Sequence, residues 1–130
     1  MKLLFTPVQA GFPSPARDEG GSTLDLERLL IDHREATFFW RVEGCSMTGM
    51  GIHHGDFLVV DRSIPPVSGH VVVAMLDGGF VVKQLIRRAG HVFLRSAHPD
   101  YPEIRIDPEQ EWTIWGVVRW SLHRLAAQKI

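Results

Sequence analysis

The 130-residue sequence lacks the features that mark several classes of protein. Cys45 is its single cysteine, so no internal disulfide bond can form, and a lone thiol is typical of a reducing compartment. No apolar run approaches the roughly 18–20 residues of a membrane-spanning helix, and the apolar stretch in MKLLF is too short for a signal peptide. We therefore expect a cytoplasmic protein with no membrane anchor.

The chain also lacks an excess of charge of either sign. Its 14 Lys and Arg residues face 15 Asp and Glu residues, and the isoelectric point is about 6.6. Such a balance does not give the basic surface that nucleic-acid-binding domains present. With 45% hydrophobic residues, the chain can bury the core of a single domain of ordinary size.

Motifs for metal binding and for common serine hydrolases are missing. Seven histidines are present, but none lies in an HExxH motif, and one cysteine cannot form paired CxxC motifs. We expect these histidines to be scattered over the surface, with no metal ion or other cofactor. The G-x-S-x-G elbow of α/β hydrolases is absent as well. The histidines are His33, His53, His54, His70, His91, His98 and His123.

The chain divides into an arm and a domain. Residues 1–22 contain TPVQAGFPSPARDEGGS, whose Pro and Gly content predicts an extended, flexible arm. Residues 23–130 carry the apolar pattern of one domain. STLDLERLLIDH predicts a short helix over about 24–31, with Ser22 or Thr23 as its N-cap.

The rest of the domain reads as about seven strands, which predicts a mostly β fold. A break at Asp77–Gly78–Gly79 between two apolar runs indicates a hairpin. No internal repeat is present. The expected strands lie in TFFWRVEG, DFLVVDRS, GHVVVAMLDGG, FVVKQLIRR, HVFLRSAH, YPEIRI and WTIWGVVRWSLHRL.

Ser46 lies on a glycine-rich turn, in GCSMTGMG, just before an apolar strand. A serine on a turn needs no further explanation, but a nucleophilic serine would need a base. His53 and His54 are close in sequence and suggest no clear catalytic triad. A Ser–Lys pair, in which a neutral lysine takes the hydroxyl proton, is the other possibility.

Lys83 is the candidate base, because the chain has only three lysines and the other two lie near its ends. It sits within FVVKQLI, where alternation places Val81, Lys83 and Leu85 on one face of a strand. Burial would lower the pKa of Lys83 and favour the neutral amine that a general base requires. The alternative is that Lys83 faces solvent.

Together, EGCSMTGMGIHHGDFLVVDRS and GHVVVAMLDGGFVVKQL resemble the LexA/UmuD (S24) family of self-cleaving Ser–Lys peptidases, and UmuD-like members in particular. The resemblance extends to AGFPSPARD, LDLERLLIDH, HPDYPEI and IWGVVRWSLHRL, and so covers about residues 10–125. It implies the compact β domain of that family, with Ser46 as nucleophile and Lys83 as general base. It also implies self-cleavage between Ala10 and Gly11 in the arm.

Backbone N–H groups of the turn at Gly44 and Cys45 are the expected oxyanion donors. Cys45 departs from the family pattern, which often has Asp before the serine, and we do not expect its thiol to be catalytic. About 35 residues separate Gly11 from Ser46, so the arm can reach the site at roughly 3.3 Å per residue. Cleavage within one chain and cleavage between chains are both possible.

The resemblance further implies a role in SOS mutagenesis after DNA damage. A RecA filament on single-stranded DNA would stimulate cleavage, and the product, 11–130, would be the accessory subunit of an error-prone Y-family translesion polymerase. A homodimer is expected, in which the strand at Trp112–Leu122 forms either the interface or simply core. The segment ahead of the domain is too short and too rich in Pro and Gly for the helix-turn-helix of LexA-type repressors, so direct DNA binding is not expected. Alternatively, the protein is a polymerase-binding module in which proteolysis is incidental.

Overall fold

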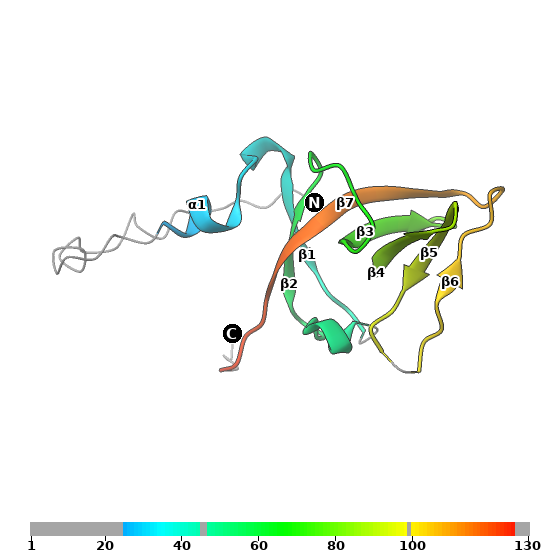
Figure 1. Cartoon of the computed structure of the whole chain (residues 1–130). Coiled ribbons are helices and arrows are strands. Elements are labelled where there is room, and N and C mark those ends of the chain that lie inside the picture. The colour runs from blue at the N-terminus through cyan, green and yellow to red at the C-terminus, as the bar shows by residue number, and fades with distance from the viewer. Residues whose placement is uncertain (1–24, 45–46, 99, 127–130) are drawn as a thin grey trace, which may run out of the picture.

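The computed structural model describes residues 25–44, 47–98 and 100–126 (Figure 1). Within them, a seven-stranded antiparallel sheet dominates, which confirms the predicted mostly β fold. The N-terminal arm with Ala10 and Gly11 lies outside the described residues. The elements are α1 (Leu26–Leu30), η3 (Arg34–Ala36), β1 (Thr37–Arg41), η4 (Thr48–Met50), β2 (Phe57–Asp61), β3 (Val71–Leu76), β4 (Gly79–Arg88), β5 (His91–Arg95), β6 (Ile104–Arg105) and β7 (Trp112–Leu122).

The predicted helix is present as α1, shorter than expected. Its N-cap is Asp25, whose carboxylate accepts hydrogen bonds from the backbone N–H groups of Glu27 and Arg28. The cap is therefore neither Ser22 nor Thr23. Helix α1 ends at Leu30, which is buried, and the backbone becomes extended at the C-cap residue Ile31.

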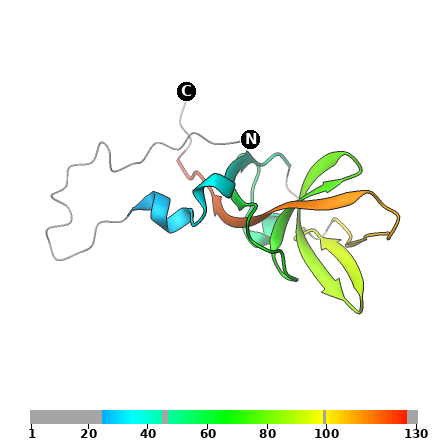
Figure 2. The same cartoon turned by 90° about the horizontal axis from the view of Figure 1, so that it is seen from above.

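Strand β7 runs through the middle of the sheet, whose strand order is β1-β2-β7-β3-β4-β5-β6 (Figure 2). It pairs with β2 on one side and with β3 on the other. The predicted hairpin joins β3 to β4 through Asp77 and Gly78, both with positive φ, as a two-residue type I′ turn requires. Gly79 is already the first residue of β4.

The sheet curls because β7 shifts register twice, once against β2 and once against β3. Such bulges increase the twist of a strand and bend it. The curl brings the edge strand β1 toward the start of β4. The rings of Trp40 and Phe80 lie 4.8 Å apart, and Trp115 of β7 lies 5.0 Å from Trp40.

The buried side chains form two apolar clusters. One contains Val72, Ala74, Leu85, Leu94, Ile106 and Val117, and the other contains Met47, Ile52, Leu58, Val60 and Val73. Because Val72 and Val73 are neighbours in β3, the two clusters lie on opposite faces of that strand. Both faces of the central strands are therefore covered.

We expected β7 to form either a dimer interface or core, and its side chains differ in this respect. Val117 is buried in the core, whereas Trp120 and Leu122 are exposed. Strand β7 pairs with β2 only between Val117 and Leu122, and with β3 only between Trp112 and Val117. Among the described residues, each edge of β7 is therefore paired along one half of the strand, and a partner could contact the exposed side chains or the unpaired half of an edge. No helix among the described residues is long and apolar enough to cross a membrane.

Candidate active site

Lys83 lies on a core-facing side of β4. It pairs with Val72 of β3 and is only 9% exposed. Val81 packs against the core cluster that contains Val72 and Leu85. The prediction that Val81, Lys83 and Leu85 share one face is confirmed, and the alternative of a solvent-facing Lys83 is wrong.

The Nζ atom of Lys83 donates a hydrogen bond of 2.5 Å to the Oγ atom of Ser96. Pairing between β4 and β5 ends at Gln84 and Arg95, and one further step in register places Ser96 opposite Lys83. The ring of Tyr101 lies 5.7 Å from Nζ, and no acidic side chain in the described part of the chain pairs with it. Burial therefore lowers the pKa of the Lys83 ammonium, which favours the neutral amine.

A cleft of about 300 Å³ opens between the end of β1 and the first half of β4. Gly44 and Met47, which flank positions 45–46, both line this cleft together with Lys83. Cys45 and Ser46 themselves lie outside the described residues. The lining consists of Trp40, Arg41, Val42, Glu43, Gly44, Met47, Ile52, Leu58, Val73, Phe80, Val81, Val82 and Lys83.

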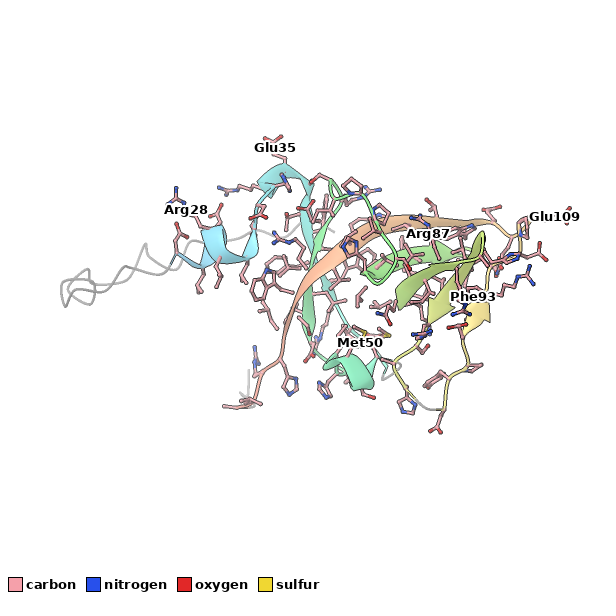
Figure 3. All side chains as sticks on the ribbon, in the orientation of Figure 1. Arg28, Glu35, Met50, Arg87, Phe93 and Glu109 are labelled. Atoms are coloured by element: carbon pink, nitrogen blue, oxygen red, sulfur yellow. The ribbon has the colours of Figure 1, made fainter. Side chains whose placement is uncertain are left out.

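The segment after position 46 is anchored next to the partner of Lys83. Met47 is buried, and its Sδ atom accepts a hydrogen bond of 3.3 Å from the backbone N–H of Ala97. The N–H of Gly49 donates to the carbonyl of Ala97 at 2.6 Å. Figure 3 shows the labelled Met50 on η4, close to the chain that follows β5. Ala97 directly follows Ser96, so one short segment holds both the Lys83 amine and the chain that leaves position 46.

The first half of β4 has one edge with which no strand in the described part of the chain pairs. The two-residue turn makes Leu76 and Gly79 a hydrogen-bonded pair, and alternation then leaves the backbone N–H and C=O groups of Phe80 and Val82 pointing away from β3. Within the described residues, the ladder to β5 begins only at Gln84. This edge, which borders the cleft, can therefore accept an extended peptide as an added strand.

Gly44, one of the two expected oxyanion donors, has a positive φ of 96°. Its N–H already donates to the Nδ1 atom of His54 at 3.2 Å, so an oxyanion at Gly44 would have to displace that acceptor. The other expected donor, Cys45, lies outside the described residues. Trp40 adds a donor that sequence reasoning did not select, because its Nε1 atom is buried without a hydrogen-bond partner among the described residues.

Sequence reasoning also missed Ser96. It lies in HVFLRSAH, which predicted a strand and nothing else. Alternation alone places Ser96 on the same face as Leu94, but its position opposite Lys83 follows only from the pairing of β4 with β5. Knowledge of that register would have been needed to find it.

Two of the seven histidines lie beside one buried carboxylate, so the expectation of scattered histidines does not hold for them. The Nδ1 atom of His123 lies 2.6 Å from Asp56 Oδ1, and that of His53 lies 3.7 Å from Asp56 Oδ2. Burial by itself would raise the pKa of Asp56, but hydrogen bonds from His123, His53 and Ser121 outweigh it and lower the pKa. Seventy positions separate the two histidines, so no spacing motif could reveal the cluster.

Comparison with known proteins gives one family and several relatives. The model of the Peptidase S24-like family matches residues 2–119. Protein MucA of Salmonella typhimurium is 44% identical over 116 residues, which cover 88% of this chain and 79% of that protein. Protein ImpA of Shigella flexneri is 43% identical over 122 residues, covering 94% and 83%. The LexA repressor of Cupriavidus taiwanensis is 34% identical over 110 residues, covering 85% of this chain and 50% of the repressor.

Proposed function

The chain belongs to the Peptidase S24-like family, and from this premise we propose that it is a serine peptidase that cleaves its own Ala10–Gly11 bond. The observation that carries the proposal is the position of Lys83. It is a buried amine without an acidic partner in the described chain, and it lines the same cleft as Gly44 and Met47. A base with a lowered pKa is thus held near both residues that flank positions 45–46.

In the proposed reaction, the neutral amine of Lys83 takes the proton of the Ser46 hydroxyl, and Ser46 Oγ attacks the carbonyl carbon of Ala10. The tetrahedral intermediate collapses as the Lys83 ammonium returns its proton to the leaving amine of Gly11. Ala10 is then held as an ester on Ser46. Water attacks the ester, Lys83 takes a proton from that water, and the proton passes to Ser46 Oγ as the ester breaks.

The substrate of this reaction is the arm, bound as an extended strand. Among the described residues, no strand pairs with the outward N–H and C=O groups of Phe80 and Val82. This supports the proposed mode of binding, because a peptide paired with them would run along the cleft toward Lys83. Small residues at Ala10 and Gly11 allow close approach of the backbone to a nucleophile. The arm can come from the same chain or from a second one.

The biological role that we propose is that of the UmuD-like proteins. A RecA filament on single-stranded DNA would favour the engaged state of the arm, and the product, 11–130, would serve as accessory subunit of an error-prone Y-family polymerase. Stimulation of this kind is a shift in the population of arm conformations and adds no chemistry. The resemblance in sequence and the family membership support this role.

We also propose that the protein is a homodimer. The apolar side chains of Phe57, Trp120 and Leu122 are exposed although they belong to the paired strands β2 and β7. Phe57 lies directly opposite Leu122, so the two form a continuous apolar surface with Trp120. These same exposed side chains favour the alternative function, a polymerase-binding module in which proteolysis is incidental.

Incubation of the purified full-length chain with and without a RecA filament on single-stranded DNA tests the proposed activity. Intact-mass measurement should show loss of residues 1–10 and a product that begins at Gly11, faster with the filament, and Ser46→Ala should stay uncut. A mutagenesis assay then separates the two roles. If full-length Ser46→Ala supports mutagenesis as well as an 11–130 chain does, the proteolysis is incidental.

A further inference from the structure

We propose that His53, Asp56 and His123 form a binding site for a divalent transition-metal ion that prefers imidazole nitrogen and carboxylate oxygen, Zn²⁺ in particular. One ligand atom from each of the three residues can be chosen so that all lie within 4.8 Å of one another. Two imidazoles and one carboxylate are the protein ligands of zinc sites that keep a fourth position open. The proposed proteolysis uses none of these residues.

The fold brings the three residues together through strand pairing and one turn. Phe57, the first residue of β2, pairs with Leu122, the last residue of β7. One further step in register places Asp56 beside His123. His53 joins them through a turn in which the N–H of Asp56 donates to the His53 carbonyl at 3.0 Å, and the N–H of His53 donates to Asp56 Oδ2 at 2.8 Å.

The carboxylate of Asp56 is fixed in place, as a metal ligand should be. Asp56 is 2% exposed, and its Oδ2 atom also accepts a hydrogen bond of 3.3 Å from the hydroxyl of Ser121. The hydroxyl and the His53 N–H both donate to Oδ2 and orient the carboxylate, in the way that outer-shell hydrogen bonds orient metal ligands. A buried carboxylate with two imidazoles beside it has the composition of a transition-metal site rather than that of a surface ion pair.

Small movements of the imidazoles would complete the geometry. Tetrahedral Zn²⁺ with bonds of about 2.1 Å requires ligand atoms about 3.4 Å apart. The Nδ1 atom of His123 lies 2.6 Å from Asp56 Oδ1, whereas that of His53 lies 3.7 Å from the other oxygen, Oδ2, so the imidazoles must rotate to bring both nitrogens around one ligand oxygen. Both imidazoles are nearly half exposed, with side-chain exposures of 43% and 46%, so they can rotate without disturbing the core.

A fourth ligand can reach the ion from solvent. A cavity of about 370 Å³ is lined by Asp56, Phe57, Leu122 and His123, among others. This open side accommodates a water molecule in the fourth position. A bound ion would also connect the end of β7 to the loop before β2, and would therefore stabilise the folded chain in proportion to its affinity.

The test is titration of the full-length chain, purified without a polyhistidine tag, with CoCl₂ and with ZnCl₂. Tetrahedral Co²⁺ has strong visible absorption bands, and calorimetry gives stoichiometry and affinity for Zn²⁺. We expect one ion per chain, the absorption of tetrahedral Co²⁺, and a higher melting temperature with Zn²⁺. His53→Ala and His123→Gln should each weaken binding about tenfold or more, and their double variant should abolish it.

Three controls test whether the ion binds at this site and whether the variants fold. His91→Ala removes an imidazole at the start of β5, in another part of the sheet, and should leave affinity unchanged. Cys45→Ser should also leave it unchanged, which excludes binding at the thiol. His123→Gln keeps an N–H donor for Asp56, and melting curves without metal show whether each variant folds. The proposal is overturned if the wild-type chain binds no stoichiometric ion, if the folded double variant binds as tightly as wild type, or if Cys45→Ser alone removes binding.

Discussion

The Lys83 amine and the Ser96 hydroxyl, opposite each other where β4 and β5 separate, are joined by a hydrogen bond of 2.5 Å. The two residues are 9% and 8% exposed, so water contributes little to holding the amine. Ser96 therefore determines where the Lys83 Nζ atom lies relative to the cleft. We regard it as a positioning residue for the proposed base.

Replacement of Ser96 by Ala should slow self-cleavage about 10- to 100-fold, because the amine loses the contact that holds it in place. It should also lower the free energy of unfolding by about 1–3 kcal/mol, the usual loss when a buried donor is left without its partner. Ser96→Thr keeps the hydroxyl and should recover most of the rate. If Ser96→Ala and Ser96→Thr lower the rate equally while both remain folded, the hydroxyl does not position the base.

Lys83→Met should stabilise the protein at neutral pH by about 1–3 kcal/mol, because methionine fills a similar volume without a buried charge. Burial lowers the pKa of Lys83 below its ordinary 10.5. Between the folded-state pKa and 10.5 the unfolded chain binds more protons than the folded chain, so wild-type stability should rise with pH across that window. Urea unfolding at several pH values measures this rise.

The Lys83→Met chain should lack the part of the rise that Lys83 contributes, so the difference in stability between the two proteins should shrink as pH increases. A difference that stays constant with pH would mean that the pKa of Lys83 is the same in the folded and unfolded states.

Val82→Pro tests the unpaired edge of β4. Proline removes the N–H of Val82, which points away from β3, and leaves the hydrogen bonds between β3 and β4 intact. If the arm binds as an added strand, cleavage should slow about tenfold, which corresponds to the loss of one hydrogen bond. Val82→Ala keeps the N–H and is the matched control. Equal rates for folded Val82→Pro and Val82→Ala would argue against strand addition at this edge.

Gly49→Ala tests the link between η4 and the segment after β5. A Cβ atom at Gly49 would lie 2.3 Å from the carbonyl oxygen of Ala97, so the two segments must move apart. We expect a loss of stability of about 1–3 kcal/mol and slower cleavage, since Met47 is anchored to the same residue. In Gly79→Ala, by contrast, the nearest atom is 3.8 Å away, so unfolding should show a smaller effect.

Local sequence patterns predicted the architecture and the strand face on which Lys83 lies, but they left open whether that face is buried. Alternation in FVVKQLI placed Lys83 on the same face as Leu85, and the Asp77–Gly78 turn placed the hairpin, because both signals are local in the chain. The YPEIRI segment formed only a two-residue strand, Ile104–Arg105, because its pairing with β5 is limited to two residue pairs.

What could not be predicted depends on pairing between distant segments. Ser96 meets Lys83, and His123 meets Asp56, only through the registers of β4 with β5 and of β2 with β7. The bulges in β7, which curl the sheet and bring Trp40 to Phe80, leave no clear signal in WTIWGVVRWSLHRL. Local patterns therefore predicted the elements, the candidate nucleophile Ser46 and the candidate base Lys83, whereas the surroundings of Lys83 required the tertiary structure.

The central claim is that neutral Lys83 activates Ser46 to cut the Ala10–Gly11 bond. The most direct measurement is the rate of that cut in the full-length chain as a function of pH, followed by intact mass and by the N-terminal residue of the product. The rate should rise with pH and level off below the ordinary lysine pKa of 10.5, since burial lowers the pKa of Lys83. Lys83→Met should lower the rate about 10²- to 10⁴-fold at every pH. A product that does not begin at Gly11, or a folded Lys83→Met chain that cuts itself as fast as wild type, would contradict the account.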